Sequence, residues 1–221
     1  MISHEKNIGF QEEKLAEYIS DHSKPEDPIL QELSRETFLK IYHPRRSSNH
    51  LSGQLLEVFS SMIRPKRILE IGTFTGYGAI CLAKGLVPGG LLHTIEINDE
   101  LEDFIRKWID KAGFSDSIML HIGDALEIIP GLNEIFDLVF IDGEKDQYCH
   151  YYDAVLDKVK PGGFIIADNV LWSGKVVLED IPEKDHFTRG ILKFNKMVQE
   201  DSRVENLLLP AFDGMMIIRK K

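Results

Sequence analysis

Short apolar runs alternate with stretches of helical periodicity along most of the chain. Five runs have the length and composition of buried strands: Arg67–Ile71, Leu91–Ile97, Ile118–Ile122, Phe136–Ile141 and Gly163–Ala167. Helical spacing of apolar residues fills the intervals, over Gly78–Leu86, Glu100–Ala112, Ala125–Ile129 and Tyr148–Val159. Strand and helix repeated in this order predict a parallel sheet covered by helices on both faces. The near-continuous apolar character of the strands is what burial on both faces requires.

The two ends of the chain follow other patterns. Helical spacing at Gln11–His22, again from Leu30 to Ile41 after two prolines, and a third time from Ser52 to Met62 predicts an N-terminal helical layer. Strand-like runs at Glu205–Leu209 and Met215–Arg219 flank an Asp-Gly turn signal and predict an antiparallel hairpin at the sheet edge. We therefore expect one domain over 1–221, with a helical layer at 1–60 and an α/β core at 61–221. That core would be Rossmann-like, with seven mostly parallel strands.

The amino-acid composition argues against a membrane or a polyanion as the partner. The 221 residues hold 26 Lys and Arg against 36 Asp and Glu, and the net charge of −10 is opposite to that of a typical polyanion binder. No apolar run reaches the roughly 20 residues that a bilayer requires, and the first residues lack the apolar core of a signal peptide. Cys81 and Cys149 make neither a disulfide framework nor a zinc site. We expect a cytoplasmic protein with no membrane contact, and the charge favours a small-molecule partner over a nucleic acid, although a local basic patch can still bind RNA.

A glycine-rich turn follows the first strand of the predicted core. The segment Glu70–Gly78 has the spacing Gly-x-x-x-Gly-x-Gly, which is neither the dinucleotide fingerprint nor a Walker A loop. Glu70 would repel phosphate and attract a cation, and Glu96 at the end of the second strand can accept both hydroxyls of a ribose. An adenosine with a cationic amino-acid tail, S-adenosylmethionine, meets these demands. A plain strand-to-helix turn is the alternative. Asp124 can contact adenine or serve as a helix N-cap.

Polar residues follow the fourth and fifth strands. Asp142 and Lys145 come after one, and Asp168 and Asn169 after the next, so a parallel sheet brings them to one edge. Two carboxylates and an amide oxygen suit Mg²⁺, Ca²⁺ or Mn²⁺. The alternative makes the aspartates helix caps and turn formers, and Lys145 a solvated surface residue.

These motifs match a known family. Glu70–Gly78, Asp142–Tyr148 and Asp168–Gly174, with Ser48–Gln54 and the Asp213-Gly214 ending, resemble the class I cation-dependent O-methyltransferases of the caffeoyl-CoA and catechol type. The resemblance implies that Asp142, Asp168 and Asn169 hold the metal. It implies cofactor contacts from eight residues: Ser48, Glu70, Gly72, Thr73, Gly78, Glu96, Ala125 and Asp142. Lys145 matches the general base, and Asp142 is the second expected catalytic residue. Trp172 matches a wall of the acceptor pocket, where Lys145 would also contact the acceptor, and the family is commonly dimeric.

The sequence departs from that family in two places. The usual Asp-Ala-Asp-Lys reads Asp142-Gly143-Glu144-Lys145, which leaves the role of Glu144 open. The loop from Trp172 to His186 differs from that of the plant enzymes, so the acceptor cannot be carried over.

The expected function is transfer of a methyl group from S-adenosylmethionine, with a divalent cation, to a hydroxyl of a catechol-like aromatic molecule. One alternative is O-methylation of a hydroxylated uridine in tRNA, with Arg45-Arg46 and Arg64–Arg67 on phosphates, although a solvated basic rim explains these residues better. A non-catalytic module that binds S-adenosylmethionine is the other.

Overall fold

The computed structural model describes residues 8–44 and 47–221. In this part of the chain one sheet has seven strands in the order β3-β2-β1-β4-β5-β7-β6. The strands are β1 (Arg67–Ile71), β2 (Leu91–Glu96), β3 (Ile118–Ile122), β4 (Phe136–Ile141), β5 (Val159–Asp168), β6 (Val204–Leu209) and β7 (Met215–Lys220). The first five pair in parallel, and β7 pairs antiparallel with both β5 and β6. The predicted parallel core and the antiparallel C-terminal hairpin are confirmed.

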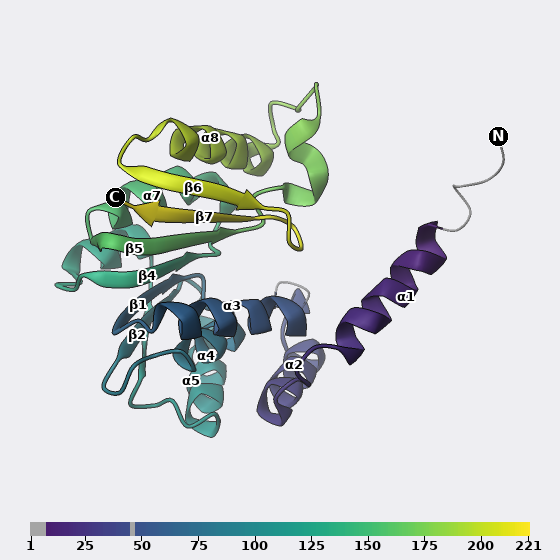
Figure 1. Cartoon of the computed structure of the whole chain (residues 1–221). Coiled ribbons are helices and arrows are strands. Elements are labelled where there is room, and N and C mark those ends of the chain that lie inside the picture. The colour runs from purple at the N-terminus through teal and green to yellow at the C-terminus, as the bar shows by residue number, and fades with distance from the viewer. Residues whose placement is uncertain (1–7, 45–46) are drawn as a thin grey trace.

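Helices cover both faces of the sheet, as Figure 1 shows. One core cluster joins the sheet to α2 (Pro28–Lys40), α3 (His50–Ile63), α4 (Tyr77–Ala83) and α5 (Glu102–Lys111). The other joins it to α6 (Ala125–Ile128), α7 (Tyr148–Leu156) and α8 (His186–Glu200). Successive residues of one strand enter different clusters: Ile68 packs in the first and Leu69 in the second. The continuous apolar strands are thus explained by burial on both faces.

The strand order reverses between β1 and β4. β2 lies on one side of β1, whereas β4 lies on the other, and both pair with it in parallel. In such sheets a crevice opens at the carboxyl ends of the strands where the order reverses, and ligands bind there. The residues that follow β1, β4 and β5 are therefore brought to one place.

The structure corrects several predicted boundaries. The helix expected to reach Val159 ends at Leu156, and β5 begins at Val159, before Pro161, because Val159 pairs with Phe136 of β4. Helix α8 was not predicted, although Ile191, Phe194 and Val198 bury one of its faces at helical spacing.

The N-terminal helices differ in how they pack. In α2 the buried face is Leu30, Leu33 and Thr37, so Phe38 is 69% exposed instead of buried with them. Helix α1 (Ile8–Asp21) extends away from the sheet (Figure 1), and its Tyr18 is 60% exposed. Within the described residues no helix is both long and apolar enough to cross a membrane.

Four short 3₁₀ turns complete the described elements: η2 (Asp99–Leu101), η3 (Ile129–Gly131), η4 (Lys145–Gln147) and η5 (Trp172–Val177). Two of them, η4 and η5, follow β4 and β5 at the edge where the order of the strands reverses.

Candidate functional site

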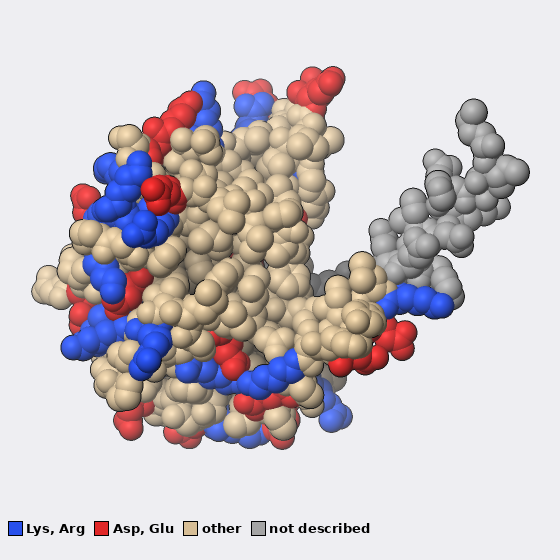
Figure 2. Space-filling model, viewed as in Figure 1, with Lys and Arg blue, Asp and Glu red and all other residues tan. Residues whose placement is uncertain are grey.

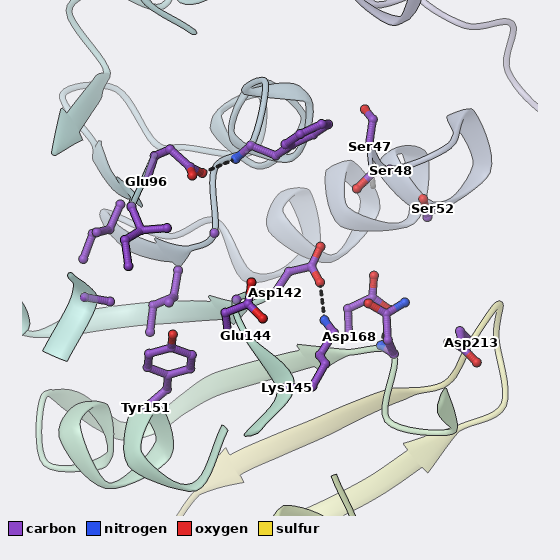
Figure 3. A pocket seen from close by; sticks show the side chains of 18 of the residues that line it. Ser47, Ser48, Ser52, Glu96, Asp142, Glu144, Lys145, Tyr151, Asp168 and Asp213 are labelled. Atoms are coloured by element: carbon purple, nitrogen blue, oxygen red, sulfur yellow. Dashed lines mark hydrogen bonds and ion pairs between the residues drawn. The ribbon is translucent and has the colours of Figure 1, made fainter. Parts of the chain in front are cut away.

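A cavity of about 640 Å³ opens at the carboxyl ends of the parallel strands. Figure 3 shows Glu96 and Tyr151 toward one end, Asp142, Lys145 and Asp168 in the middle, and Asp213 toward the other end. Of the predicted site residues, the cavity wall includes Ser48, Gly72, Glu96, Ala125, Asp142, Lys145, Asp168, Asn169 and Trp172. The remaining three, Glu70, Thr73 and Gly78, line a small recess beside it.

The glycine turn joins three strand ends. Gly72 has φ of 96°, and its backbone N–H donates to Ile95 at 3.0 Å. A Cβ at Gly72 would lie 2.5 Å from the backbone oxygen of Asp142. Glycine is therefore required here for its conformation and for the close approach of the two chains.

Glu96 is held by backbone donors. Its Oε2 accepts from Phe74 N at 2.7 Å, and its Oε1 accepts from Asn98 N at 3.0 Å. The side chain is buried, yet it lines the cavity. Asp124, in contrast, is exposed and accepts from Leu126 N at 2.8 Å, so it acts as the N-cap of α6.

Glu70 lies in the recess at the end of a buried hydrogen-bonded chain. Thr94 Oγ1 donates to Glu70 Oε2 at 2.5 Å, and the Thr73 and Thr94 hydroxyls are 2.5 Å apart. Because Thr94 donates to Glu70, Thr73 must donate to Thr94. Burial raises the pKa of Glu70 to about 8. A Cβ at Gly78 would lie 2.6 Å from Glu70 Oε1, so Gly78 leaves the space that this carboxyl occupies.

Lys145 is a buried lysine between two oxygen atoms. Its Nζ donates to Asp142 Oδ1 at 2.7 Å and to the Tyr148 hydroxyl at 2.6 Å. That hydroxyl in turn donates to the backbone oxygen of Asp168 at 3.0 Å, which links the ends of β4 and β5. Lys145 is only 7% exposed. The alternative interpretation of Lys145 as a solvated surface residue is therefore wrong.

Asp168 is buried beside this group. Burial and the nearby charge of Asp142 raise the pKa of Asp168 to about 7. Its Oδ1 accepts from the backbone N–H of Asn169 at 2.7 Å, and Asn169 has φ of 59°, which asparagine tolerates better than most residues. No cluster of three or more His, Cys, Asp or Glu within 8–44 and 47–221 could hold a metal ion. The present group has two carboxylates, and its third oxygen donor is an amide.

Aromatic side chains line both ends of the cavity. Trp172 packs edge to face on Phe187, with centroids 6.0 Å apart, and Phe212 lies on the same cavity wall. Phe187 and Phe212 were missed, although the helical pattern of α8 could have placed the former. Tyr151 packs in one core cluster, only 8% exposed, and its ring also lines the cavity. A Cβ at Gly143 would lie 2.9 Å from the Tyr151 ring.

The parallel sheet with an antiparallel β7, the glycine turn after β1 and the buried acidic residue that ends β2 define a class I S-adenosylmethionine-dependent methyltransferase. The O-methyltransferase family model matches residues 20–221, and the chain belongs to this family. It is an S-adenosylmethionine-dependent O-methyltransferase of the caffeoyl-CoA type.

Individual relatives cover nearly the whole chain. It is 34% identical to a caffeoyl-CoA O-methyltransferase of Eucalyptus gunnii, over 95% of this chain and 88% of that protein. The O-methyltransferase of Bacillus cereus, solved in complex with SAH, is similar with a TM-score of 0.86 and 29% identity, covering 94% and 97% of the two chains. The SAH-bound methyltransferase PaMTH1 of Podospora anserina has a TM-score of 0.88 at 28% identity, with 100% and 98% covered.

Proposed function

We propose that this enzyme methylates a hydroxyl of a catechol-like aromatic small molecule and uses a divalent cation held by Asp142, Asp168 and Asn169. The observation that carries the proposal is the gathering of these three side chains and Lys145 in one cavity, beside the glycine turn. A protein that only binds S-adenosylmethionine needs neither a buried lysine nor a second acidic strand end.

The donor set fits a hard cation. Carboxylate and amide oxygens are preferred by Mg²⁺, Ca²⁺ and Mn²⁺ and not by zinc. Asp168 is 8% exposed and lies near the charge of Asp142, so a cation would relieve the repulsion between them. When bound, the cation supplies positive charge that stabilises the acceptor oxyanion.

Lys145 is the proposed general base. As a neutral amine, its Nζ would take the proton of the acceptor hydroxyl. The oxyanion would then bond to the methyl group of S-adenosylmethionine as the methyl–sulfur bond breaks, and S-adenosylhomocysteine would leave. Hydrogen bonds to Asp142 and Tyr148 fix the position of Nζ, and burial excludes water around it. These contacts orient the base before the acceptor arrives.

The cavity supports one orientation of the cofactor. Glu96 would accept the ribose hydroxyls, with Tyr151 beside the adenine, because these two lie at the same end (Figure 3), and Ala125, which also lines the cavity, would contact the adenine as well. Gly72 approaches the backbone of Asp142 and also lines the cavity with Ser48, and the amino-acid tail would pass these residues. Glu70, Thr73 and Gly78 would support this tail from the recess behind it.

The acceptor would lie between the proposed cation site and the aromatic wall of Trp172, Phe187 and Phe212. These rings offer flat apolar surfaces for an aromatic ring. Several relatives act on caffeoyl-CoA by name. A small acceptor of this kind, with two adjacent hydroxyls, could direct both oxygens to the cation.

The tRNA alternative has less support. The basic run Arg64–Arg67 lies at the amino end of β1, opposite the cavity, and Arg67 pairs with Glu134 at 2.9 Å. Arg45 and Arg46 lie outside the described residues. We therefore include tRNA as a second methyl acceptor in the activity assay.

A homodimer is also proposed. Figure 2 shows few charged side chains in the middle of one face, over α3 and the neighbouring strands. Met62 of α3 is 76% exposed and Val58 is 46% exposed, and an exposed apolar patch on this helix would suit a contact between protomers. Sedimentation of the protein and of Met62→Glu would test this, since a dimer that uses this face should dissociate in the variant.

The activity assay uses a catechol acid such as caffeate, S-adenosylmethionine, and Mg²⁺ or a chelator. We expect methylation that stops on chelation and is lost in Asp168→Ala. Lys145→Ala should lower turnover while calorimetry finds unchanged cofactor affinity. Lys84→Ala is the matched control, because Lys84 is a half-buried lysine that, like Lys145, pairs with a carboxylate, Asp27 at 3.1 Å, but lies outside the cavity. Full activity with chelator, or methylation of tRNA alone, would contradict the proposal.

A further inference from the structure

The segment that follows β5 has an unusual backbone. Asn169, Trp172 and Ser173 have φ of 59°, 48° and 54°, and Gly174 has φ of 75°. Residues other than glycine enter this left-handed region only at a cost, so the surroundings must hold them there. The same segment carries one proposed cation ligand, Asn169, and the proposed acceptor wall, Trp172.

The turn between β6 and β7 holds this segment from one side. Asp213 Oδ1 accepts from Ser173 N at 2.5 Å, and the Asp213 backbone oxygen accepts from Leu171 N at 2.9 Å. The Gly214 oxygen accepts from Val170 N at 3.0 Å. A Cβ at Gly214 would lie 2.4 Å from Leu171 Cγ, so the two chains are packed as closely as glycine allows.

Helix α8 holds the segment from another side. Asn195 Nδ2 donates to the backbone oxygen of Val170 at 2.9 Å. Asn195 Oδ1 is buried and has no partner among the described residues. An unpaired buried oxygen is unfavourable, and the bond that the Asn195 nitrogen makes offsets part of this cost. Asn195 does not line the cavity.

We propose that Asn195 and Asp213 are positioning residues of the methyl transfer. Their hydrogen bonds to Val170 and Ser173 hold the segment in which Asn169, Trp172 and Ser173 are left-handed, and thereby set the Asn169 amide and the Trp172 indole at the cavity. This inference rests on the proposed function for the roles of Asn169 and Trp172. It adds that two residues from other elements decide where these groups lie.

Four variants separate positioning from other roles. Asn195→Ala and Asp213→Ala remove the bonds to the segment. Asp213→Asn keeps an oxygen that can accept from Ser173, so it should behave like the parent if position matters and charge does not. Gln199→Ala is the matched control, because Gln199 is an amide on the same helix that bonds instead to Asn206 of β6, at 3.1 Å.

The first measurement is Mn²⁺ affinity by the electron paramagnetic resonance signal of the free ion, with SAH affinity by calorimetry. Asn195→Ala and Asp213→Ala should weaken Mn²⁺ binding by about tenfold or more. SAH affinity should stay within about twofold, because Glu96 and Gly72 are held by other bonds. Equal losses of SAH and Mn²⁺ affinity would mean a merely structural role and would overturn the proposal.

The second measurement is acrylamide quenching of tryptophan fluorescence, which needs neither metal nor activity. Trp108 is 1% exposed, so increased quenching reports on Trp172, and Trp172→Phe verifies the assignment. The two alanine variants should be quenched more than the parent, Asp213→Asn and Gln199→Ala. If the parent protein does not bind Mn²⁺, the proposed use of a divalent cation is refuted. The quenching measurement alone would then test whether Asn195 and Asp213 position the segment. Unchanged quenching in both alanine variants would overturn the proposal that Asn195 and Asp213 position the segment. If Asp213→Ala fails to fold, the result for Asn195→Ala alone tests the proposal.

Discussion

The buried carboxyl of Glu70 should make the stability of this enzyme depend on pH. It is 1% exposed, and Thr94 is the hydrogen-bond donor that the structure gives it. Burial raises its pKa from 4.5 to about 8. The folded protein therefore binds more protons than the unfolded chain between these two values.

The sign and size of this pH dependence follow from the linkage between proton binding and unfolding. The contribution of Glu70 to stability is complete below pH 4.5 and is lost as pH rises to about 8. The slope is about 1.4 kcal/mol per pH unit, or about 5 kcal/mol over the whole range as an upper limit. Glu70→Gln keeps the oxygen that accepts from Thr94 and removes the titration. The difference in unfolding free energy, variant minus parent, should therefore increase between pH 5.5 and 8.

Urea unfolding at several pH values measures this difference. Glu127→Gln is the control, because Glu127 is exposed and its neutralisation should leave the pH slope unchanged. The same carboxyl should ionise when the cationic cofactor binds. Calorimetric titration of S-adenosylmethionine in phosphate and in Tris at pH 7 counts the protons released on binding. The parent should release up to about 0.9 proton per site, and Glu70→Gln should release less. Equal pH slopes and equal proton release in parent and Glu70→Gln would refute the reasoning.

Two further outcomes can be measured by urea unfolding. Gly72→Ala should lower the unfolding free energy by more than about 2 kcal/mol, because the new Cβ would lie 2.5 Å from a backbone oxygen. Gly89→Ala, also at positive φ but with nothing within 4 Å, should cost only about 1 kcal/mol, and equal costs would contradict the steric argument. Burial lowers the pKa values of His93 and His121, which bond to each other at 3.0 Å, so their contribution is lost as pH falls below 6.5. His93→Asn should reduce the loss of unfolding free energy between pH 6.5 and 5. An unchanged dependence of the unfolding free energy on pH would contradict this prediction.

The features that could be predicted from the sequence are those that depend on neighbouring residues. Apolar runs gave the strands, and the glycine spacing gave the turn after β1, because backbone conformation and burial are set locally there. Helix α8 was not predicted, although the sequence carries its signals: Asp185 caps its N-terminus, and Ile191, Phe194 and Val198 have helical spacing. The beginning of β5 was assigned to a helix because its pairing with Phe136 is not visible in the local pattern.

The contacts that orient the site come from residues far apart in the chain. Glu70 was predicted to meet a cation, but its partner Thr94 lies 24 residues away. Lys145 was predicted at the site, but its burial depends on Tyr148 and on the end of β5. Asp124 is the exception, because its bond to Leu126 is local, and the sequence left open whether its carboxylate caps α6 or contacts adenine.

The departure at Gly143 illustrates why a motif cannot be interpreted alone. The family pattern has alanine there, and the sequence gives no reason for the change. In the structure a Cβ at Gly143 would lie 2.9 Å from the Tyr151 ring, which lines the cavity at the end near Glu96. Glycine and tyrosine thus form one packing unit, in which the ring occupies space next to the missing methyl group. Alanine at Gly143 without a smaller residue at Tyr151 would displace that ring, so the two positions should be exchanged together.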